Sequence, residues 1–325
     1  MKNNLIVVFA LSLLLVGCIP FLGGGNPPPI KVDFNSVHTG AQGIVITFAP
    51  DRPQSDYVIV PSGNDITVII GLENKGAWDI PPGKGVLAIN YDKTYMDFTQ
   101  NSQDFGSDTL QGRSLVRALG DKTRLEFDGK IKPLEEIKKD TVINAVTCYE
   151  YGTEYIFDVC IDTDPTNTKP VTKACDLTQN KKKYNSLSGQ GAPVAITSLD
   201  QAIKIKDNKK MDIDFIIKVR NVGNGKVYDI AATPDKLCRQ GGGLEEADKV
   251  IITADLAGQL LKCETNEDGT MFVRQGLDGV IDCRVVDYID TNVDSFISKL
   301  KVTLNYDYVD TNGKNIILRK AGARG

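Results

Sequence analysis

Apolar residues recur at every other position in two stretches of the chain, which is the pattern of a strand with one buried face. The stretches cover residues 66–72 and 213–219. Each is followed by an Asn-x-Gly turn, which begins at Asn74 in the first case and at Asn221 in the second. Asparagine and glycine tolerate the backbone angles of a tight turn. We therefore expect antiparallel strands, and an all-β fold.

The two stretches belong to a longer duplication, in which three segments recur in the same order. The pairs are 42–47 with 190–197, 66–80 with 213–230, and 142–151 with 300–308. The strand, Asn-x-Gly turn and following strand are typical of the first hairpin of many immunoglobulin-like sandwiches. The sequence thus predicts two tandem immunoglobulin-like β-sandwiches, over residues 31–164 and 176–325, joined by a linker at 165–175.

Each copy ends in a Tyr-acid-Tyr segment, Tyr149 to Tyr151 and Tyr306 to Tyr308. Alternate positions on a strand share a face, so we expect each tyrosine pair to cap a sandwich core, with hydroxyls reaching solvent or backbone. The alternative is an aromatic binding patch.

Turn and helix signals complete the secondary-structure prediction. Hairpin turns are expected at Glu267-Asp268-Gly269, at Asn312-Gly313 and around Gly152. Helical periodicity is short: residues 134–139 and 256–261 offer one or two turns each.

The N-terminus has the features of an export signal. Lys2 precedes a mainly apolar stretch at 5–16, which covers roughly 18 Å as a helix, too short for a ~30 Å hydrocarbon core. Leu15-Val16-Gly17-Cys18 then resembles a lipobox, in which the cysteine is lipidated. We expect residues 1–17 to be a removed signal peptide, and 18–30 to be the lipidated Cys18 with a Gly/Pro tether.

This interpretation locates the protein on the extracellular face of the cell membrane, held by the lipid on Cys18. The alternative is an uncleaved signal anchor over residues 5–22, which is barely long enough to span.

The remaining six cysteines form an even set, which in an exported protein predicts disulfides. They are Cys148, Cys160, Cys175, Cys238, Cys263 and Cys283. Six cysteines allow 15 pairings, so the connectivity is open. Our first choice joins Cys148 to Cys160 across the expected hairpin at Gly152, which leaves Cys175 and two bridges to the second domain. A metal site is the rival interpretation, but no CxxC pair occurs.

Calcium is the one cofactor to consider, because oxygen ligands gather at the expected domain junction. The candidate ligands are Asp158, Asp162, Asp164 and Asn167. A hydrophilic linker is the interpretation we favour. Asp287, Asp290 and Asp294 form a weaker group of the same kind.

Composition and charge argue against several functions. The 325 residues carry a net charge of -4, which does not suit nucleic-acid binding. The one histidine, His38, precludes the usual acid–base partner for a Ser or Cys nucleophile, and we expect it to face solvent in a loop. No Gly-rich loop leads into a helix. We therefore predict a protein that is not an enzyme.

In these segments the chain resembles an uncharacterised group of archaeal exported proteins with tandem immunoglobulin-like, adhesion-type domains. The segments that carry the resemblance are 39–43, 72–76, 148–153, 159–162, 189–194 and 220–223. The resemblance implies location and fold, and it implies no activity.

Two functions follow as hypotheses. The first is a non-enzymatic surface protein that presents its sandwiches for contacts with other surface or envelope proteins, in adhesion, envelope structure or as an accessory subunit. The second is a binding module for a small molecule or glycan, which needs a concave aromatic cleft. A hydrolase based on two carboxylates is a third, more distant, alternative.

Overall fold

The computed structural model describes residues 34–168, 170, 172–206, 210–241, 245–285 and 294–322. The expected signal peptide, Cys18 and the tether lie outside these residues. Strands make up 55% of the described residues and helices 7%, so the predicted all-β fold is confirmed. Residues 34–325 form one compact unit, and no helix among the described residues is long and apolar enough to cross a membrane.

Seventeen strands make up most of the part of the chain that the structure describes. In the first half of the chain they are β1 (Ile44–Phe48), β2 (Asp56–Ile59), β3 (Asn64–Asn74), β4 (Gly85–Asn90), β5 (Met96–Phe98), β6 (Ser102–Asp104), β7 (Lys122–Ile131) and β8 (Lys138–Asp162). In the second half they are β9 (Val194–Ile205), β10 (Met211–Asn221), β11 (Lys226–Tyr228), β12 (Lys249–Leu256), β13 (Gln259–Leu260), β14 (Lys262–Cys263), β15 (Thr270–Phe272), β16 (Gly279–Arg284) and β17 (Ser295–Lys320).

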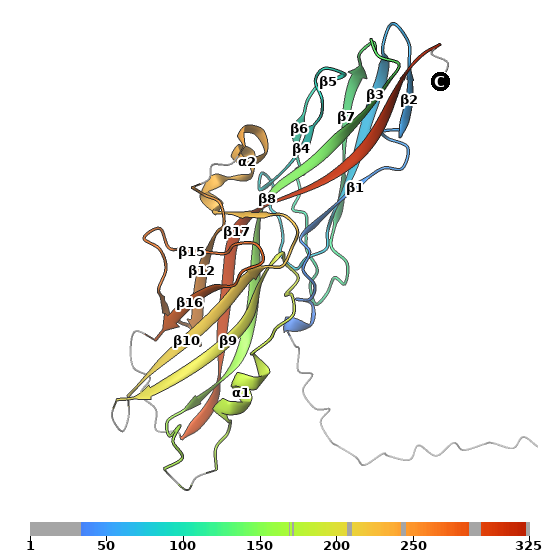
Figure 1. The fold of residues 1–325 in the computed structure, drawn as a ribbon. Coiled ribbons are helices and arrows are strands. Elements are labelled where there is room, and N and C mark those ends of the chain that lie inside the picture. The colour runs from blue at the N-terminus through green and yellow to red at the C-terminus, as the bar shows by residue number, and fades with distance from the viewer. Residues whose placement is uncertain are drawn as a thin grey trace, which may run out of the picture. The chain divides into compact units, whose positions relative to one another are not determined.

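The strands form two four-stranded sheets and one nine-stranded sheet. The small sheets have the orders β1-β3-β7-β5 and β14-β16-β10-β9, and the large sheet has β13-β12-β17-β8-β4-β6 as its main path. Figure 1 shows each small sheet beside a different half of β8 and β17. We call the half with β1, β3, β5 and β7 sandwich 1, and the half with β9, β10, β14 and β16 sandwich 2.

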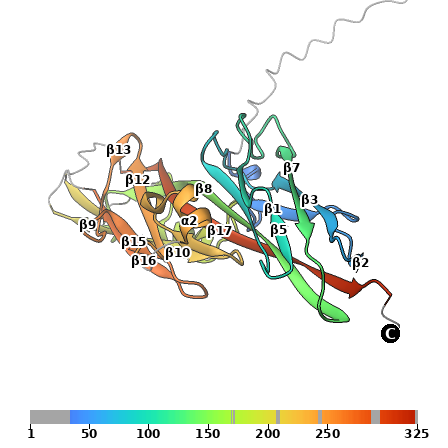
Figure 2. The ribbon, with the colours of Figure 1, turned by 90° about the horizontal axis from the view of Figure 1, so that it is seen from above.

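The two longest strands run through both sandwiches. β8 and β17 pair antiparallel without a break from Lys138 opposite Arg319 to Asp162 opposite Ser295. β4 and β2 extend this pair in sandwich 1, and β12 extends it in sandwich 2. Figure 2 shows the pair continuing from one sandwich into the other. We call β8 and β17 together the shared ribbon.

The shared ribbon changes the domain organisation that the duplication suggested. The expected division at 165–175 assigns all of β8 to the first domain, whereas residues 152–162 pair with the part of β17 that belongs to sandwich 2. In the same way, residues 308–319 of β17 pair with the part of β8 in sandwich 1. The last strand of each copy therefore begins in its own sandwich and continues into the sandwich of the other copy.

The four tyrosines of the repeats meet at the centre of the shared ribbon. Tyr149 lies opposite Tyr308, and Tyr151 lies opposite Tyr306. All four side chains are buried, and neighbouring ring centroids are 5.4–6.4 Å apart. Because alternate residues of a strand share a face, this cluster joins the cores of the two sandwiches.

The tyrosine hydroxyls bind the backbone, as one of our expectations stated. The hydroxyl of Tyr149 accepts from the backbone N–H of Ile44 at 3.1 Å, and that of Tyr306 accepts from Val194 at 3.3 Å. These two bonds are equivalent in the duplication, since each ties a last strand to the first strand of its own copy. The binding-patch alternative does not fit, because the rings are inaccessible.

The Asn-x-Gly turns are held by the other two tyrosines. Tyr151 donates its hydroxyl hydrogen to Oδ1 of Asn74 at 2.9 Å, and Tyr308 does the same to Asn221 at 3.2 Å. Oδ1 of Asn74 also accepts from the N–H of Gly76 at 3.2 Å. A Cβ on Gly76 would lie 1.9 Å from the tyrosine hydroxyl, so the turn requires glycine here.

The opposite face of the ribbon centre carries a buried carboxyl group. Asp307 lies between the two tyrosines in sequence and opposite Glu150 on β8. Its side chain is fully buried, and neither carboxyl oxygen has a hydrogen-bond partner among the described residues. Burial, and then the charge of Glu150, raise the pKa of Asp307 to about 8, against a smaller opposite effect of Lys84. Lys84 itself binds Glu150 at 2.6 Å.

Two expected hairpins are absent, and both lie in the shared ribbon. Gly152 is paired with Asn305, and Asn312-Gly313 is paired with residues 144 and 145, so neither segment turns. The predicted turn at Glu267-Asp268-Gly269 is present between β14 and β15, with Gly269 at φ +79°.

The helices differ from those expected. Residues 134–139 lead into β8, and 256–261 span the ends of β12 and β13. The α-helices are α1 (Leu177–Lys183) and α2 (Pro234–Gln240), and short 3-10 turns occur at η1 (Phe34–Ser36) and η2 (Ile230–Ala232). Both α-helices begin with a side-chain cap, Asp176 for α1 and Thr233 for α2.

Candidate functional site

A mainly apolar groove of about 610 Å³ opens beside the one tryptophan of the chain. Its volume is within the range of ligand-binding clefts. We call it the Trp78 groove. It is lined by Phe34, Val37, His38, Ala77, Trp78, Asp79, Pro81, Arg113, Ser114, Leu115, Val116 and Glu154.

Contacts to the shared ribbon fix the first wall of the groove. Asn35 in η1 forms two hydrogen bonds with the backbone of Ile156 on β8, of 2.9 and 3.3 Å. His38 is buried, and its Nδ1 lies 3.0 Å from the carbonyl oxygen of Glu154. The expectation that His38 faces solvent in a loop is wrong, because η1 packs this segment on β8. Burial lowers the pKa of His38.

Trp78 is positioned by the turn after β3. Its backbone carbonyl oxygen accepts from the side-chain amide of Asn74 at 2.8 Å, and its backbone N–H donates to the hydroxyl of Tyr151 at 3.4 Å. The indole ring packs directly over Gly152, where a Cβ would lie 2.6 Å from a ring carbon. The glycine that suggested a hairpin therefore serves to admit the tryptophan ring.

Arg113 lines the groove. Its backbone N–H donates to the carbonyl oxygen of Gly76 at 2.7 Å, and its guanidinium donates to the carbonyl oxygen of Thr39. Its Nε is buried and has no hydrogen-bond partner among the described residues. The groove thus has apolar side chains, the aromatic rings of Phe34 and Trp78, and one arginine in its lining.

A tight turn forms the rim. Ser114 and Arg117 exchange two backbone hydrogen bonds, of 2.8 and 3.0 Å, and leave Leu115 and Val116 at the tip. No functional site was expected in this segment from the sequence. The sequence does contain a signal for it, because Leu115 and Val116 are apolar and lie between two arginines, outside any alternating strand pattern. Turns are usually composed of other residues.

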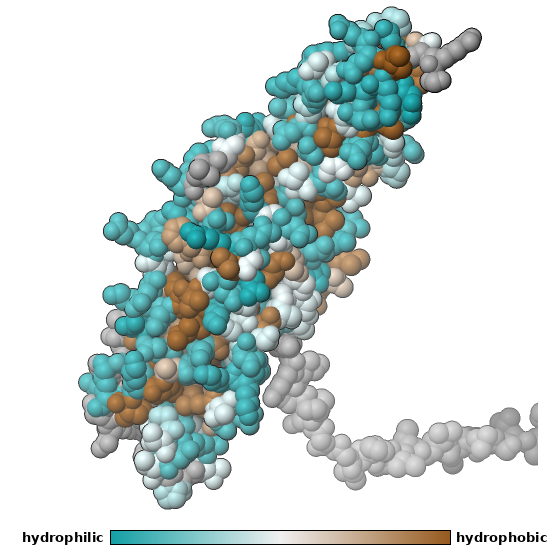
Figure 3. Space-filling model, viewed as in Figure 1, coloured by the Kyte–Doolittle hydropathy of each residue, from teal (hydrophilic) through white to brown (hydrophobic). Residues whose placement is uncertain are grey.

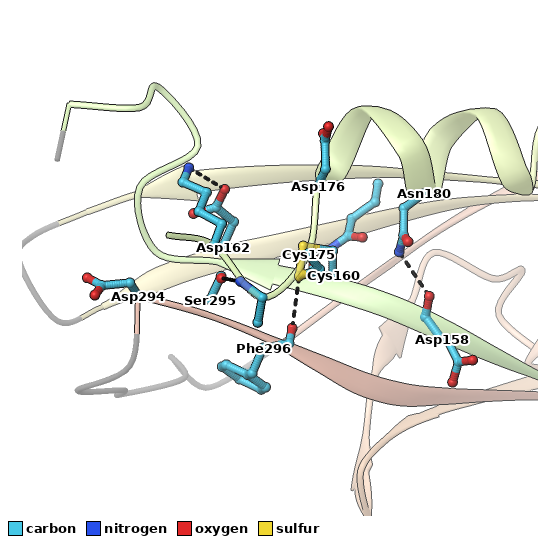
Figure 4. Close-up of a disulfide and its surroundings, with 12 residues drawn as sticks. Asp158, Cys160, Asp162, Cys175, Asp176, Asn180, Asp294, Ser295 and Phe296 are labelled. Atoms are coloured by element: carbon cyan, nitrogen blue, oxygen red, sulfur yellow. Dashed lines mark hydrogen bonds and ion pairs between the residues drawn. A yellow bond between two sulfur atoms is a disulfide. The ribbon is translucent and has the colours of Figure 1, made fainter. Parts of the chain in front are cut away.

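The residues considered for calcium do not come together as a cation site. Lys173 donates to Oδ2 of Asp162 at 2.7 Å and to the carbonyl oxygen of Asp164. Oδ1 of Asp164 accepts from the N–H and the hydroxyl of Thr168, at 3.0 and 2.7 Å. The ammonium group of Lys173 thus supplies the positive charge beside Asp162, which Figure 4 labels close to the Cys160–Cys175 disulfide.

The other calcium candidates lie apart from that pair. Asp158 binds Lys299 across the shared ribbon, and Asn167 donates its backbone N–H to Asp164 at 3.0 Å. Of the weaker group, Asp287 and Asp290 lie outside the described residues. Among those described, no group of three or more His, Cys, Asp or Glu residues could hold a metal ion.

The six cysteines form three disulfides, as predicted. The pairs are Cys148–Cys238, Cys160–Cys175 and Cys263–Cys283. The chosen pair Cys148–Cys160 is wrong because both residues lie on β8, where 12 residues span roughly 40 Å.

The disulfides also connect segments that we had assigned to different domains. Cys148–Cys238 fixes α2 on the outer face of β8, and Cys160–Cys175 ties the segment before α1 to the other end of β8 (Figure 4). Only the third disulfide, between β14 and β16, joins neighbouring strands within the second copy.

Comparisons with known proteins give no family. No protein-family model matches the chain, and no curated protein matches it. Among solved structures, the secreted serine protease VesC from Vibrio cholerae is 10% identical with a TM-score of 0.20, over 82% of this chain and 50% of that one. The chain thus spans about half the length of that protein. A structure titled BspA_C_mut is 8% identical with a TM-score of 0.15, over 86% of this chain and 97% of that one. Neither likeness bears on function.

Proposed function

We propose that this chain is an exported, non-enzymatic surface protein. It is held on the outer face of a cell membrane by a lipid on Cys18, and it presents its two sandwiches to other surface or envelope proteins. The observation that carries the proposal is that all six cysteines after Cys18 are paired. Disulfides form and persist in oxidising compartments outside the cytosol.

Sandwich 2 offers a surface suited to such contacts. Phe272, Leu277 and Val280 are exposed around a shallow depression of about 420 Å³, with the guanidinium of Arg274 5.8 Å from the ring centroid of Phe272. Exposed aromatic and arginine side chains are enriched at protein interfaces. Figure 3 shows apolar residues interrupting the hydrophilic surface where β9, β10 and β16 lie.

The experiment that tests the anchor is fractionation of cells that express wild-type protein or Cys18→Ser. We expect wild-type protein in the membrane fraction, with a lipid-modified Cys18 by mass spectrometry, and release or failed processing of the variant. Equal membrane association of both proteins would contradict lipid anchoring and favour an uncleaved signal anchor.

The contact role is tested by cross-linking in native membranes. We expect wild-type protein to cross-link to a partner protein and Leu277→Asp with Val280→Asp to lose that partner. Asp65→Asn, an exposed change on β3, is the matched control and should keep it. Equal cross-linking by all three proteins would exclude this surface.

The Trp78 groove favours a second candidate function, the binding of a small apolar molecule or a glycan. Trp78 and Phe34 supply aromatic faces, and the buried Nε of Arg113 lacks a partner among the described residues. Because Trp78 is the one tryptophan, its emission reports directly on occupancy of the groove. Titration with acyl chains and with oligosaccharides should shift that emission if the groove is a ligand site, and leave it unchanged if it is not.

A further inference from the structure

The rim of the Trp78 groove is an exposed turn with an unusual composition. The side chains at its tip, Leu115 and Val116, are 51% and 98% exposed, and nearby Leu119 is 72% exposed. The two residues at the centre of such a turn are usually glycine, asparagine, aspartate or proline. We call residues 114–117 the apolar turn. Its two backbone hydrogen bonds fix the turn, which leaves Val116 almost fully exposed and Leu115 half exposed at the edge of the groove.

Cationic side chains flank the apolar tip. Arg113 and Arg117 lie on either side of it, and residues 113–120 contain no acidic residue. Arg117 contacts the carboxylate of Asp121, while its side chain remains 40% exposed. An apolar tip with arginines behind it matches the boundary between acyl chains and phosphate headgroups.

The apolar turn also lies close to the point where the N-terminal segment joins the described body. Phe34 and Val37 line the same groove as Leu115 and Val116. Phe34 follows Cys18 by 16 positions along the chain. A chain of that length spans at most about 55 Å. A lipid on Cys18 would therefore keep the bilayer within reach of this face.

We propose that the apolar turn inserts Leu115 and Val116 into the surface of the bilayer, as a second membrane contact beside the lipid. This inference rests on the proposed anchoring through Cys18. The contact orients the body, since one tether leaves it free to rotate whereas a tether and an inserted turn define one face toward the membrane. The Trp78 ring lies beside the inserted residues and close to the headgroups.

The test uses protein that begins at residue 18 and carries Cys18→Ser, so that neither the signal segment nor a lipid contributes and binding depends on the body alone. The probe is a vesicle of phosphatidylcholine and phosphatidylglycerol with brominated acyl chains, which quench nearby tryptophan. We expect vesicles to quench Trp78 emission and to co-sediment with the protein. Leu115→Asp with Val116→Asp should lower the partition coefficient at least about tenfold, because the inserted apolar surface is lost.

A matched control is Leu277→Asp with Val280→Asp, which removes equally exposed apolar side chains far along the chain. It should bind vesicles like the parent protein. Unchanged Trp78 emission without vesicles verifies that each variant is folded around the groove.

Three results would overturn the inference. The first is the absence of quenching, and the second is quenching that both double variants retain. The third is a dimer, seen by sedimentation, that Leu115→Asp with Val116→Asp abolishes, since the turn would then bind a second copy. Failure of the lipid anchor is a separate result. If mass spectrometry shows an unmodified Cys18 in cells, the proposed lipid anchor is wrong. The membrane contact by the apolar turn would still be supported if the unlipidated protein binds vesicles through that turn.

Discussion

The buried carboxyl group of Asp307 should make the protein less stable as the pH rises. The side chain lies at the centre of the shared ribbon, fully buried, without a hydrogen-bond partner in the described part of the chain, and opposite Glu150. Its pKa is raised from 3.8 to about 8 in the folded protein. Replacement by asparagine keeps the size and polarity of the side chain and removes its ionisation.

The sign and size of the effect follow from proton linkage. A raised folded-state pKa means that the native protein binds more protons than the unfolded chain between pH 3.8 and about 8. The free energy of unfolding therefore falls as pH rises through this window. The loss contributed by Asp307 is on the order of 4 kcal/mol at pH 7, and it grows by about 3–4 kcal/mol between pH 5 and pH 8.

The assay is urea unfolding of wild-type protein and Asp307→Asn at pH 5 and pH 8. We expect the variant to be stabilised relative to wild type, by several kcal/mol more at pH 8 than at pH 5. Asp65→Asn, an exposed aspartate change on β3, should leave the wild-type pH dependence in place. If the difference in the free energy of unfolding between wild type and Asp307→Asn is the same at pH 5 and pH 8, the reasoning is refuted.

Further predictions concern the covalent and steric ties of the fold. Removing one disulfide with Cys148→Ala and Cys238→Ala should lower the free energy of unfolding by about 4 kcal/mol, because the bridge closes a loop of 90 residues; urea unfolding with and without reductant measures this. Fragments 31–168 and 169–325 should each fail to give dispersed NMR spectra alone, because each sandwich needs part of a strand from the other copy. The two fragments should fold when they are mixed. Two fragments that fold independently would contradict the shared ribbon. Gly152→Ala should displace the ring of Trp78, shift its emission and lower the free energy of unfolding by about 1–3 kcal/mol, as measured by urea unfolding. Unchanged emission would mean that the ring does not pack closely on residue 152.

The sequence predicted the features of this fold that depend on local patterns. Alternating apolar residues predicted β3 and β10, and the Asn-x-Gly signature predicted the turns that follow them. The paired tyrosines were expected to reach the backbone, which they do through Ile44 and Val194. These features depend on residues close in sequence or on the two-residue period of a strand, so one sequence suffices to find them.

What the sequence did not reveal is the continuation of β8 and β17. Asn312-Gly313 has the composition of a hairpin turn, yet it is an ordinary part of a ladder with residues 144 and 145. The side-chain amide of Asn312 instead donates to the carbonyl oxygen of Ile46 at 3.0 Å. Tertiary pairing here outweighs local turn preference, because both long strands gain a full set of partners by running straight.

The disulfide pairing was hidden for the same reason. Proximity in sequence favoured Cys148 with Cys160, but a continuous strand holds them far apart. The true partners, Cys238 and Cys175, approach only after α2 and the segment before α1 have packed on β8. The Trp78 groove also needs four separate segments, around residues 34–38, 77–81, 113–116 and 154, so no single window of sequence contains it.

The continuation of each last strand into the other sandwich has a mechanical consequence. In ordinary tandem modules, a pull that separates two neighbours loads one linker and a weak interface. Here β8 and β17 both cross from one sandwich to the other, so the same pull acts along two covalent backbones that run in opposite directions. Their ladder is then loaded in shear, with many hydrogen bonds sharing the force. The two sandwiches cannot part unless a strand is drawn out of a core, which makes the pair behave under tension as one rigid link.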